Sequence, residues 1–229
     1  MRVVWAAVAA GFLLRAAFGL GYWTGKPLTH DEREYLALAA NLAQGRGFVQ
    51  ELPGEPPDPQ VQRFGRAPVY PLFLAPLTLA SPELRAGRLP DGVPGAVKVA
   101  QSAVGALGIW FIAAIAWRVA GRRAGITAAV VAAVYPPLVW ICAYALSEAL
   151  YSTLAMGAAW ALGALTDRQE TNDSRVFAPI GVAGVLTGCA ALTRPAMLFF
   201  VPLAALLILW RAPSRRTGFA RAACFVGLV

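Results

Sequence analysis

Long apolar runs, broken by short basic or proline-containing turns, are the feature that most constrains what this chain can fold into. A helix of about twenty apolar residues crosses the hydrocarbon core of a bilayer, and six runs of that order can be counted. A seventh run opens near Arg221 and is cut off at Val229. The sequence therefore predicts an all-α fold: a polytopic transmembrane helix bundle of six helices plus a truncated seventh. The predicted helices span residues 3–23, 95–117, 124–144, 146–165, 177–192 and 195–210.

The composition fits a membrane protein and excludes several other classes. Only 14% of the residues are charged, where about 25% is usual in soluble domains. The net charge of +8 does not indicate nucleic acid, because the basic residues punctuate apolar runs and do not gather on a soluble face. The three cysteines lie inside apolar runs without a paired framework or metal-ligand spacing. With one histidine and no glycine-rich phosphate motif, the sequence predicts neither a metal nor a cofactor.

Arginine placement predicts how the chain is oriented, because cytoplasmic loops of membrane proteins carry an excess of Lys and Arg. The turn after the second predicted helix holds Arg118, Arg122 and Arg123, whereas the turn after the third holds no basic residue. We therefore expect a multi-pass protein of the cell membrane (inner or plasma), with a cytoplasmic N-terminus and residues 24–94 forming a long extracytoplasmic loop. Residues 1–229 are expected to form a single domain that is truncated at its C-terminus.

The long loop opens with a helix-start pattern rich in acids. Thr29 followed three residues later by Glu32 is a capping-box pattern. Asp31 and Glu32 then fall in the first turn, where the positive end of the helix dipole favours their ionised forms. We expect a short juxtamembrane helix that offers a carboxylate at the membrane surface. The alternative is that Asp31 and Glu32 only cap the helix.

Further along the loop, Arg66 heads an apolar segment that is interrupted by prolines. Residues 67–77 are too few to cross a bilayer, so an interfacial or re-entrant segment is expected. A plain membrane-anchoring loop is the alternative, but it leaves Arg66 unexplained. Between the two parts of the loop, the proline-rich residues 51–59 are predicted to be mobile.

Charged residues also stand at the outer ends of the later helices, where each needs a physical reason. Glu148 lies at the outer end of the fourth predicted helix, and Arg194 lies at the outer turn between the fifth and sixth. The alternatives are that Glu148 snorkels to the interface and that Arg194 anchors the turn. Arg15, inside the first helix, is expected to snorkel or to pair within the bundle. Because a carboxylate can act as a base and arginine suits phosphate, these positions together predict a site for a lipid-linked phosphate ester.

Several short motifs follow one another in order along the chain, and each is weak alone. The first is an acidic motif that ends in tyrosine, and the last is a Leu-Thr-Arg-Pro turn. The motifs are DEREY from Asp31, GRGF from Gly45, RAPVYP from Arg66, Lys98 with Gln101, YPP from Tyr135, SEALY from Ser147 and LTRP from Leu192.

In this order and spacing, the chain resembles the N-terminal half of the integral-membrane glycosyltransferases of the GT-C class. The nearest branch holds the aminoarabinose transferases of lipid A, the protein O-mannosyltransferases and their RgtA/B/C/D-like relatives. The resemblance implies an inverting transfer of a sugar from a polyprenyl-phosphate donor to a hydroxyl of a glycan, lipid or protein acceptor, outside the cytoplasm. Glu34 stands where aminoarabinose transferases carry a basic residue, so the same donor and acceptor are not implied.

The resemblance also implies roles for individual residues. Asp31 falls on the catalytic base, Arg66 on the contact to the donor phosphate, and Glu148 on an acid that lines the same cavity. The full predicted site comprises Asp31, Glu32 and Glu148 as catalytic carboxylates, Arg66 and Arg194 as donor-phosphate ligands, and His30, Tyr35, Tyr70 and Lys98 as lining residues.

Two other interpretations stay open. A small polytopic transporter or lipid-binding scaffold without chemistry would use the same charges to bind a lipid head group. Transporters often carry internal repeats, and no repeat is visible in this sequence. The chain is also expected to be an inactive fragment when it stands alone, if later helices close the site.

Overall fold

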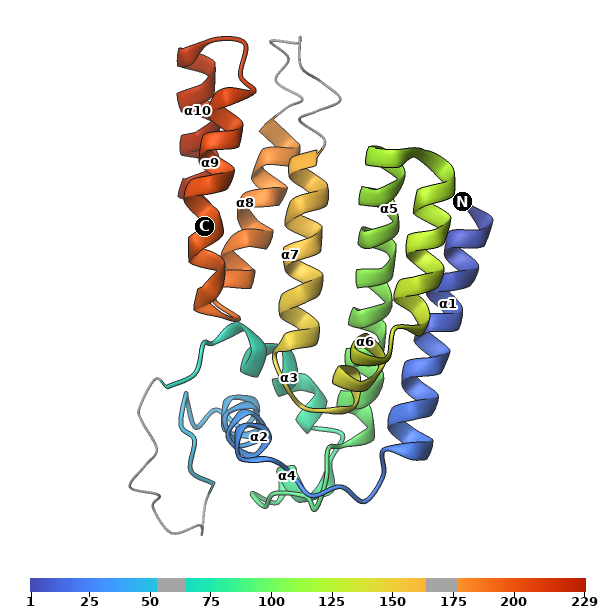
Figure 1. Ribbon diagram of the computed structural model, residues 1–229. Helices are drawn as coiled ribbons and strands as arrows, with labels where there is room; N and C mark the ends of the chain where they lie inside the picture. Colours follow the sequence, from blue (N-terminus) through green and yellow to red (C-terminus); the bar gives the residue numbers. More distant parts are fainter. Residues whose placement is uncertain (53–64, 164–176) are drawn as a thin grey trace.

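The computed structural model describes residues 1–52, 65–163 and 177–229, and these residues form helices and loops without a strand (Figure 1). The predicted mobile segment at residues 51–59 lies mostly outside the described residues. The all-α class predicted from the sequence is therefore confirmed for the described part of the chain.

The bundle begins with α1 (Arg2–Ala17) packed against α5 (Gly95–Val134). Within α5 the chain folds back at Gly121, whose φ of +80° is in the left-handed region that favours glycine. The result is two antiparallel limbs rather than one continuous helix (Figure 1). The other members of the bundle are η1 (Phe18–Tyr22), which extends α1 as a π-helix, α7 (Glu148–Gly163), α8 (Phe177–Ala191), η5 (Pro195–Phe199), α9 (Phe200–Trp210) and α10 (Arg215–Gly227).

The third predicted helix, residues 124–144, is shorter than the sequence predicted. It ends at Val134, because Tyr135 precedes a proline and takes an extended conformation (ψ 115°). The δ-carbon of a proline clashes with a helical residue before it, which stops the helix here. The chain then continues as two short pieces at the end of the bundle, α6 (Pro136–Trp140) and η2 (Ile141–Ala143).

Two other predicted boundaries were also wrong. The fourth helix begins at Glu148 rather than at residue 146. The seventh begins at Arg215 rather than near Arg221, because the Ser214 side chain caps it by accepting a hydrogen bond from the Thr217 N–H at 3.2 Å. The helices predicted at 177–192 and 195–210 are confirmed to within a residue, although the latter starts with a 3₁₀ turn.

The surface of the bundle indicates that the chain associates with a membrane. Two helices are long and apolar enough to cross one, Arg2–Tyr22 and the folded Gly95–Val134. Large apolar side chains point outward from both halves of the bundle, where water would disfavour them. They include Leu13, Val119, Phe199, Leu203 and Trp210.

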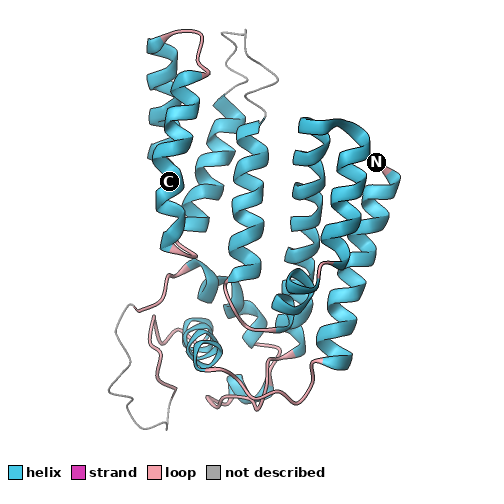
Figure 2. Ribbon diagram, viewed as in Figure 1, coloured by secondary structure: helices cyan, strands magenta, loops and turns pink. Residues whose placement is uncertain are grey.

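The long first loop folds into short helices at the end of the bundle opposite the N-terminus. α2 (His30–Ala43), α3 (Val69–Thr78) and α4 (Pro82–Arg85) lie there, and the described loops beside them are drawn in pink in Figure 2. Their apolar faces form one buried cluster with the start of α5. Its fully buried members include Leu36, Tyr70, Leu74, Leu84 and Val97.

Candidate functional site

The capping box predicted at the start of α2 is present. Thr29 is the N-cap residue, and its hydroxyl oxygen accepts a hydrogen bond from the Glu32 N–H at 3.4 Å. In return, Glu32 Oε2 accepts from both the N–H and the hydroxyl of Thr29, each at 2.8 Å. Two N–H groups that a helix start leaves unpaired are thereby satisfied.

Glu32 also ties α2 to a distant segment. Its other oxygen, Oε1, accepts from the Ala145 N–H at 2.9 Å, and its side chain is buried. Both carboxylate oxygens are therefore occupied by internal donors. The capping role considered for Glu32 is borne out, and its predicted catalytic role stays a prediction.

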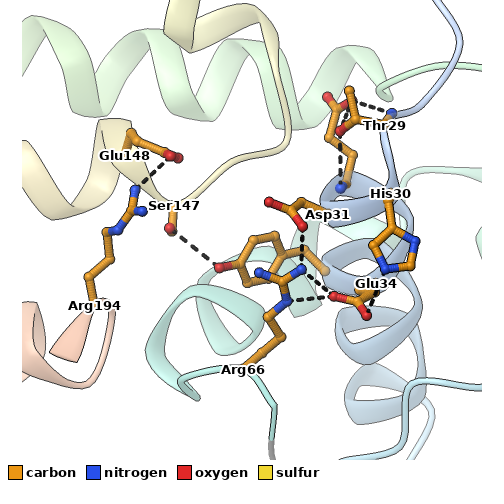
Figure 3. A network of polar contacts seen from close by, with 10 residues as sticks. Thr29, His30, Asp31, Glu34, Arg66, Ser147, Glu148 and Arg194 are labelled. Atoms are coloured by element: carbon orange, nitrogen blue, oxygen red, sulfur yellow. Dashed lines mark hydrogen bonds and ion pairs between the residues drawn. The ribbon is translucent and has the colours of Figure 1, made fainter. Parts of the chain in front are cut away.

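Arg66 lies at the centre of a charged group on the other side of α2 (Figure 3). Its guanidinium forms ion pairs with Asp31 and with Glu34, and only 23% of its side chain is exposed. The guanidinium carbon also lies 5.0 Å from the centre of the Tyr35 ring, within cation–π range. We call Arg66, Asp31 and Glu34 the Arg66 cluster.

The electrostatics of the Arg66 cluster keep the arginine charged. Burial lowers the pKa of the Arg66 guanidinium, but hydrogen bonds and charge interactions with Asp31 and Glu34 more than offset it, so the pKa is raised above its ordinary value. The cluster thus holds a permanent cation next to an Asp31 carboxylate that is 51% exposed. His30 extends the group, with Nε2 at 3.4 Å from Glu34 Oε1.

Two tyrosines connect the Arg66 cluster to the base of the bundle. The Tyr35 hydroxyl lies 3.4 Å from Ser147 Oγ, and its ring meets the Tyr70 ring edge-on with the centroids 4.8 Å apart. The fully buried Tyr70 donates to Gln101 Oε1 at 3.2 Å. Burial raises the pKa of Tyr70 well above its ordinary value, so its hydroxyl stays protonated. Tyr35 therefore contacts Arg66 directly, and Tyr70 packs against Tyr35 on the buried side.

A second ion pair faces the same end of the bundle. Arg194 Nη1 lies 2.6 Å from Glu148 Oε1, with both side chains about two-fifths exposed. Figure 3 shows Ser147 between this pair and the Arg66 cluster. The Val69 N–H donates to the Leu192 carbonyl at 3.1 Å, which holds the start of α3 beside the turn that carries Arg194.

Lys98 lies outside the Arg66 cluster. Its Nζ donates to the carbonyls of Gly19 (3.0 Å) and Trp23 (2.7 Å), and it is largely buried. A cavity of about 620 Å³ opens beside it, and neither Asp31 nor Arg66 lines this cavity. The charged residues of its wall are Lys26, Glu32, Asp91 and Lys98.

The structure therefore divides the predicted site residues into two groups. Asp31, Arg66, Tyr35 and His30 come together, with Tyr70 below them and the Glu148–Arg194 pair alongside, whereas Glu32 and Lys98 line the separate cavity. The sequence analysis missed Glu34 as a ligand of Arg66, although its helical spacing from His30 and Asp31 was a usable signal. Among the described residues, no three His, Cys, Asp or Glu side chains gather as metal ligands.

Comparisons with known proteins bear on the fold. No family model and no curated protein matches this sequence. A solved structure of the protein O-mannosyltransferase Pmt1–Pmt2 complex of S. cerevisiae, bound to the sugar donor, is similar with a TM-score of 0.74 and 18% sequence identity. The match covers 98% of this chain and 32% of that chain, so this chain spans about a third of its length. The chain therefore has a GT-C-like fold.

Proposed function

We propose that this chain forms the donor-binding and catalytic part of a membrane glycosyltransferase that uses a polyprenyl-phosphate sugar. The observation that carries the proposal is the Arg66 cluster, a held arginine beside a half-exposed carboxylate at the loop end of an apolar bundle. The GT-C-like fold supports it, because the similar yeast protein is named as a mannosyltransferase bound to a sugar donor.

The proposed reaction uses the two main members of the cluster in complementary roles. Asp31 accepts the proton of the acceptor hydroxyl, whose oxygen then bonds to the anomeric carbon of the sugar. The bond from the anomeric carbon to the phosphate oxygen breaks, and its electron pair leaves with the polyprenyl phosphate. Arg66 binds that phosphate through charge-assisted hydrogen bonds. The configuration at the anomeric carbon inverts.

The side of the membrane on which the proposed reaction takes place follows from the position of the arginine-bearing turns. The turn at Gly121 and the turn before Arg215 lie at the N-terminal end of the bundle, together with their arginines (Figure 1). The positive-inside rule assigns that end to the cytoplasm, so the Arg66 cluster would lie outside it in a multi-pass protein. Glu148 and Arg194 would then border the same reaction space, with acceptor and membrane lipid approaching between them.

The test is loss of sugar transfer in Asp31→Asn, measured in membranes with a panel of labelled polyprenyl-phosphate hexoses. Removing a general base typically lowers the rate about a hundred- to ten-thousand-fold. Glu83→Gln is the matched control, because Glu83 is an exposed acid on α4 at the same end of the bundle, and its carboxylate accepts a hydrogen bond from the neighbouring Ser81. Near-normal transfer by Asp31→Asn would contradict the proposed role of Asp31.

A lipid-binding scaffold without chemistry is the competing function, and the same assay separates the two. A scaffold would bind polyprenyl phosphate through Arg66 but would release none from the labelled donors. The enzyme releases it in proportion to the sugar transferred.

A further inference from the structure

The resting Arg66 cluster presents a problem for a phosphate ligand. One guanidinium is shared by two carboxylates, Asp31 and Glu34, so the group carries a net negative charge. An incoming phosphate anion is repelled by that charge as long as both carboxylates keep their places. One of them must give way for Arg66 to bind phosphate.

The hydrogen bonds of the guanidinium show which edge is committed. Glu34 Oε2 accepts from Arg66 Nε at 2.5 Å and also pairs with Nη2, so it covers the Nε–Nη2 edge. Asp31 contacts Nη2 alone. Nη1 has no partner among the residues that the structure describes. Within the described part of the chain, Asp31 is therefore the one residue that obstructs the Nη1–Nη2 edge, which has the fork geometry that suits two phosphate oxygens.

The two carboxylates also differ in how firmly they are placed. The Glu34 side chain is 15% exposed and contacts His30 as well as Arg66, so it has two partners. The Asp31 side chain is 51% exposed and lies at the start of α2, where water can solvate it after release. Asp31 is thus the member that can leave at little cost.

We infer that Asp31 is a latch on Arg66 that the donor phosphate displaces, while Glu34 remains as the positioning residue that aims the guanidinium. This inference rests on the proposed function and adds an order of events to it. The phosphate takes the Nη1–Nη2 edge, and the Asp31 carboxylate is released from its cation. The Asp31 carboxylate is free to contact the acceptor hydroxyl only after the donor is bound. Before that, the ion pair holds it against Arg66.

Equilibrium binding of undecaprenyl phosphate to the full chain in lipid nanodiscs tests the inference. Asp31→Asn removes the competitor and is expected to bind the probe about two- to fivefold tighter, the range that a partly exposed ion pair supports. Glu34→Gln removes the same charge but also the carboxylate that positions the guanidinium, so it is expected to bind the probe less tightly than Asp31→Asn does. Glu83→Gln, on α4 and outside the Arg66 cluster, controls for the general loss of a negative charge.

The outcomes separate this inference from the proposed function. If the unchanged chain binds the probe no better than Arg66→Ala does, the proposed function itself fails. If binding depends on Arg66 but Asp31→Asn does not tighten it, only the latch is overturned. Equal tightening by Asp31→Asn and Glu34→Gln also overturns the latch, because both carboxylates would then merely screen the arginine.

Discussion

Two arginines, one inside the helix bundle and one among the loop helices, are held in opposite ways. Arg15 is 1% exposed inside the bundle and donates to four backbone carbonyls: Leu138 at 3.1 Å, Gly11 at 2.9 Å, Ala133 at 3.0 Å and Ala132 at 2.9 Å. Arg66 lies at the loop end and bonds to two side-chain carboxylates, one of them half exposed.

The partners of the two arginines differ in whether they can move away. The carbonyls of Ala132 and Ala133 belong to the last turn of α5, which has no further helical N–H to satisfy them. Arg15 fills that need and places its positive charge at the negative end of the helix dipole. Its partners cannot move without unwinding a helix. A carboxylate can rotate away, so an arginine held by carboxylates can exchange a partner for a ligand. We therefore assign Arg15 to the fold and Arg66 to the ligand.

The largest expected effect comes from Arg15→Leu, which should destabilise the protein without touching the site. The substitution leaves the carbonyls at the end of α5 unpaired in an apolar environment, at a cost of about 3–5 kcal/mol. Thermal unfolding in detergent would measure it as a large drop in melting temperature. Arg15→Lys keeps the charge but lacks the planar fork of donors. Its melting temperature should therefore lie between that of the unchanged chain and that of Arg15→Leu. An unchanged melting temperature in Arg15→Leu would remove the contrast with Arg66.

A smaller effect is expected from Glu32→Gln, which sharpens the comparison between neighbouring acids. Glu32 supports the cap at Thr29 and the Ala145 segment, so weakening it should cost about 1–3 kcal/mol of stability. Sugar transfer measured below the melting temperature should persist in Glu32→Gln and fail in Asp31→Asn. Full loss of transfer in a folded Glu32→Gln would instead support the catalytic role predicted for Glu32.

Local patterns predicted much of the architecture, because they act over a few residues. The Thr29–Glu32 spacing gave the capping box, and the apolar runs gave the helices at 177–192 and 195–210 almost to the residue. The early stop at Val134 was also present in the sequence as the Tyr-Pro-Pro motif. Apolar residues lie on both sides of this motif, and the helix was therefore predicted to continue through it to residue 144.

The pairings between distant residues could not be predicted, because they depend on how the helices pack. Nothing local links Arg15 to Ala132, Glu32 to Ala145, or Lys98 to the carbonyl of Trp23. The contact between Arg66 and Glu34 likewise joins segments 32 residues apart. Sequence reasoning selected Asp31 and Arg66 as candidates but not the contact of Arg66 with Glu34.

The most direct test of the central claim is the preference of the chain for a polyprenyl phosphate over the polyprenol of the same length, measured by equilibrium binding in nanodiscs. A charge-assisted contact to Arg66 predicts that the phosphate binds about ten- to hundredfold tighter. The preference should disappear in Arg66→Ala, return in part in Arg66→Lys, and survive in Arg15→Lys at a temperature where that variant is folded. A phosphate preference that persists unchanged in Arg66→Ala would contradict the assignment of Arg66 to the ligand.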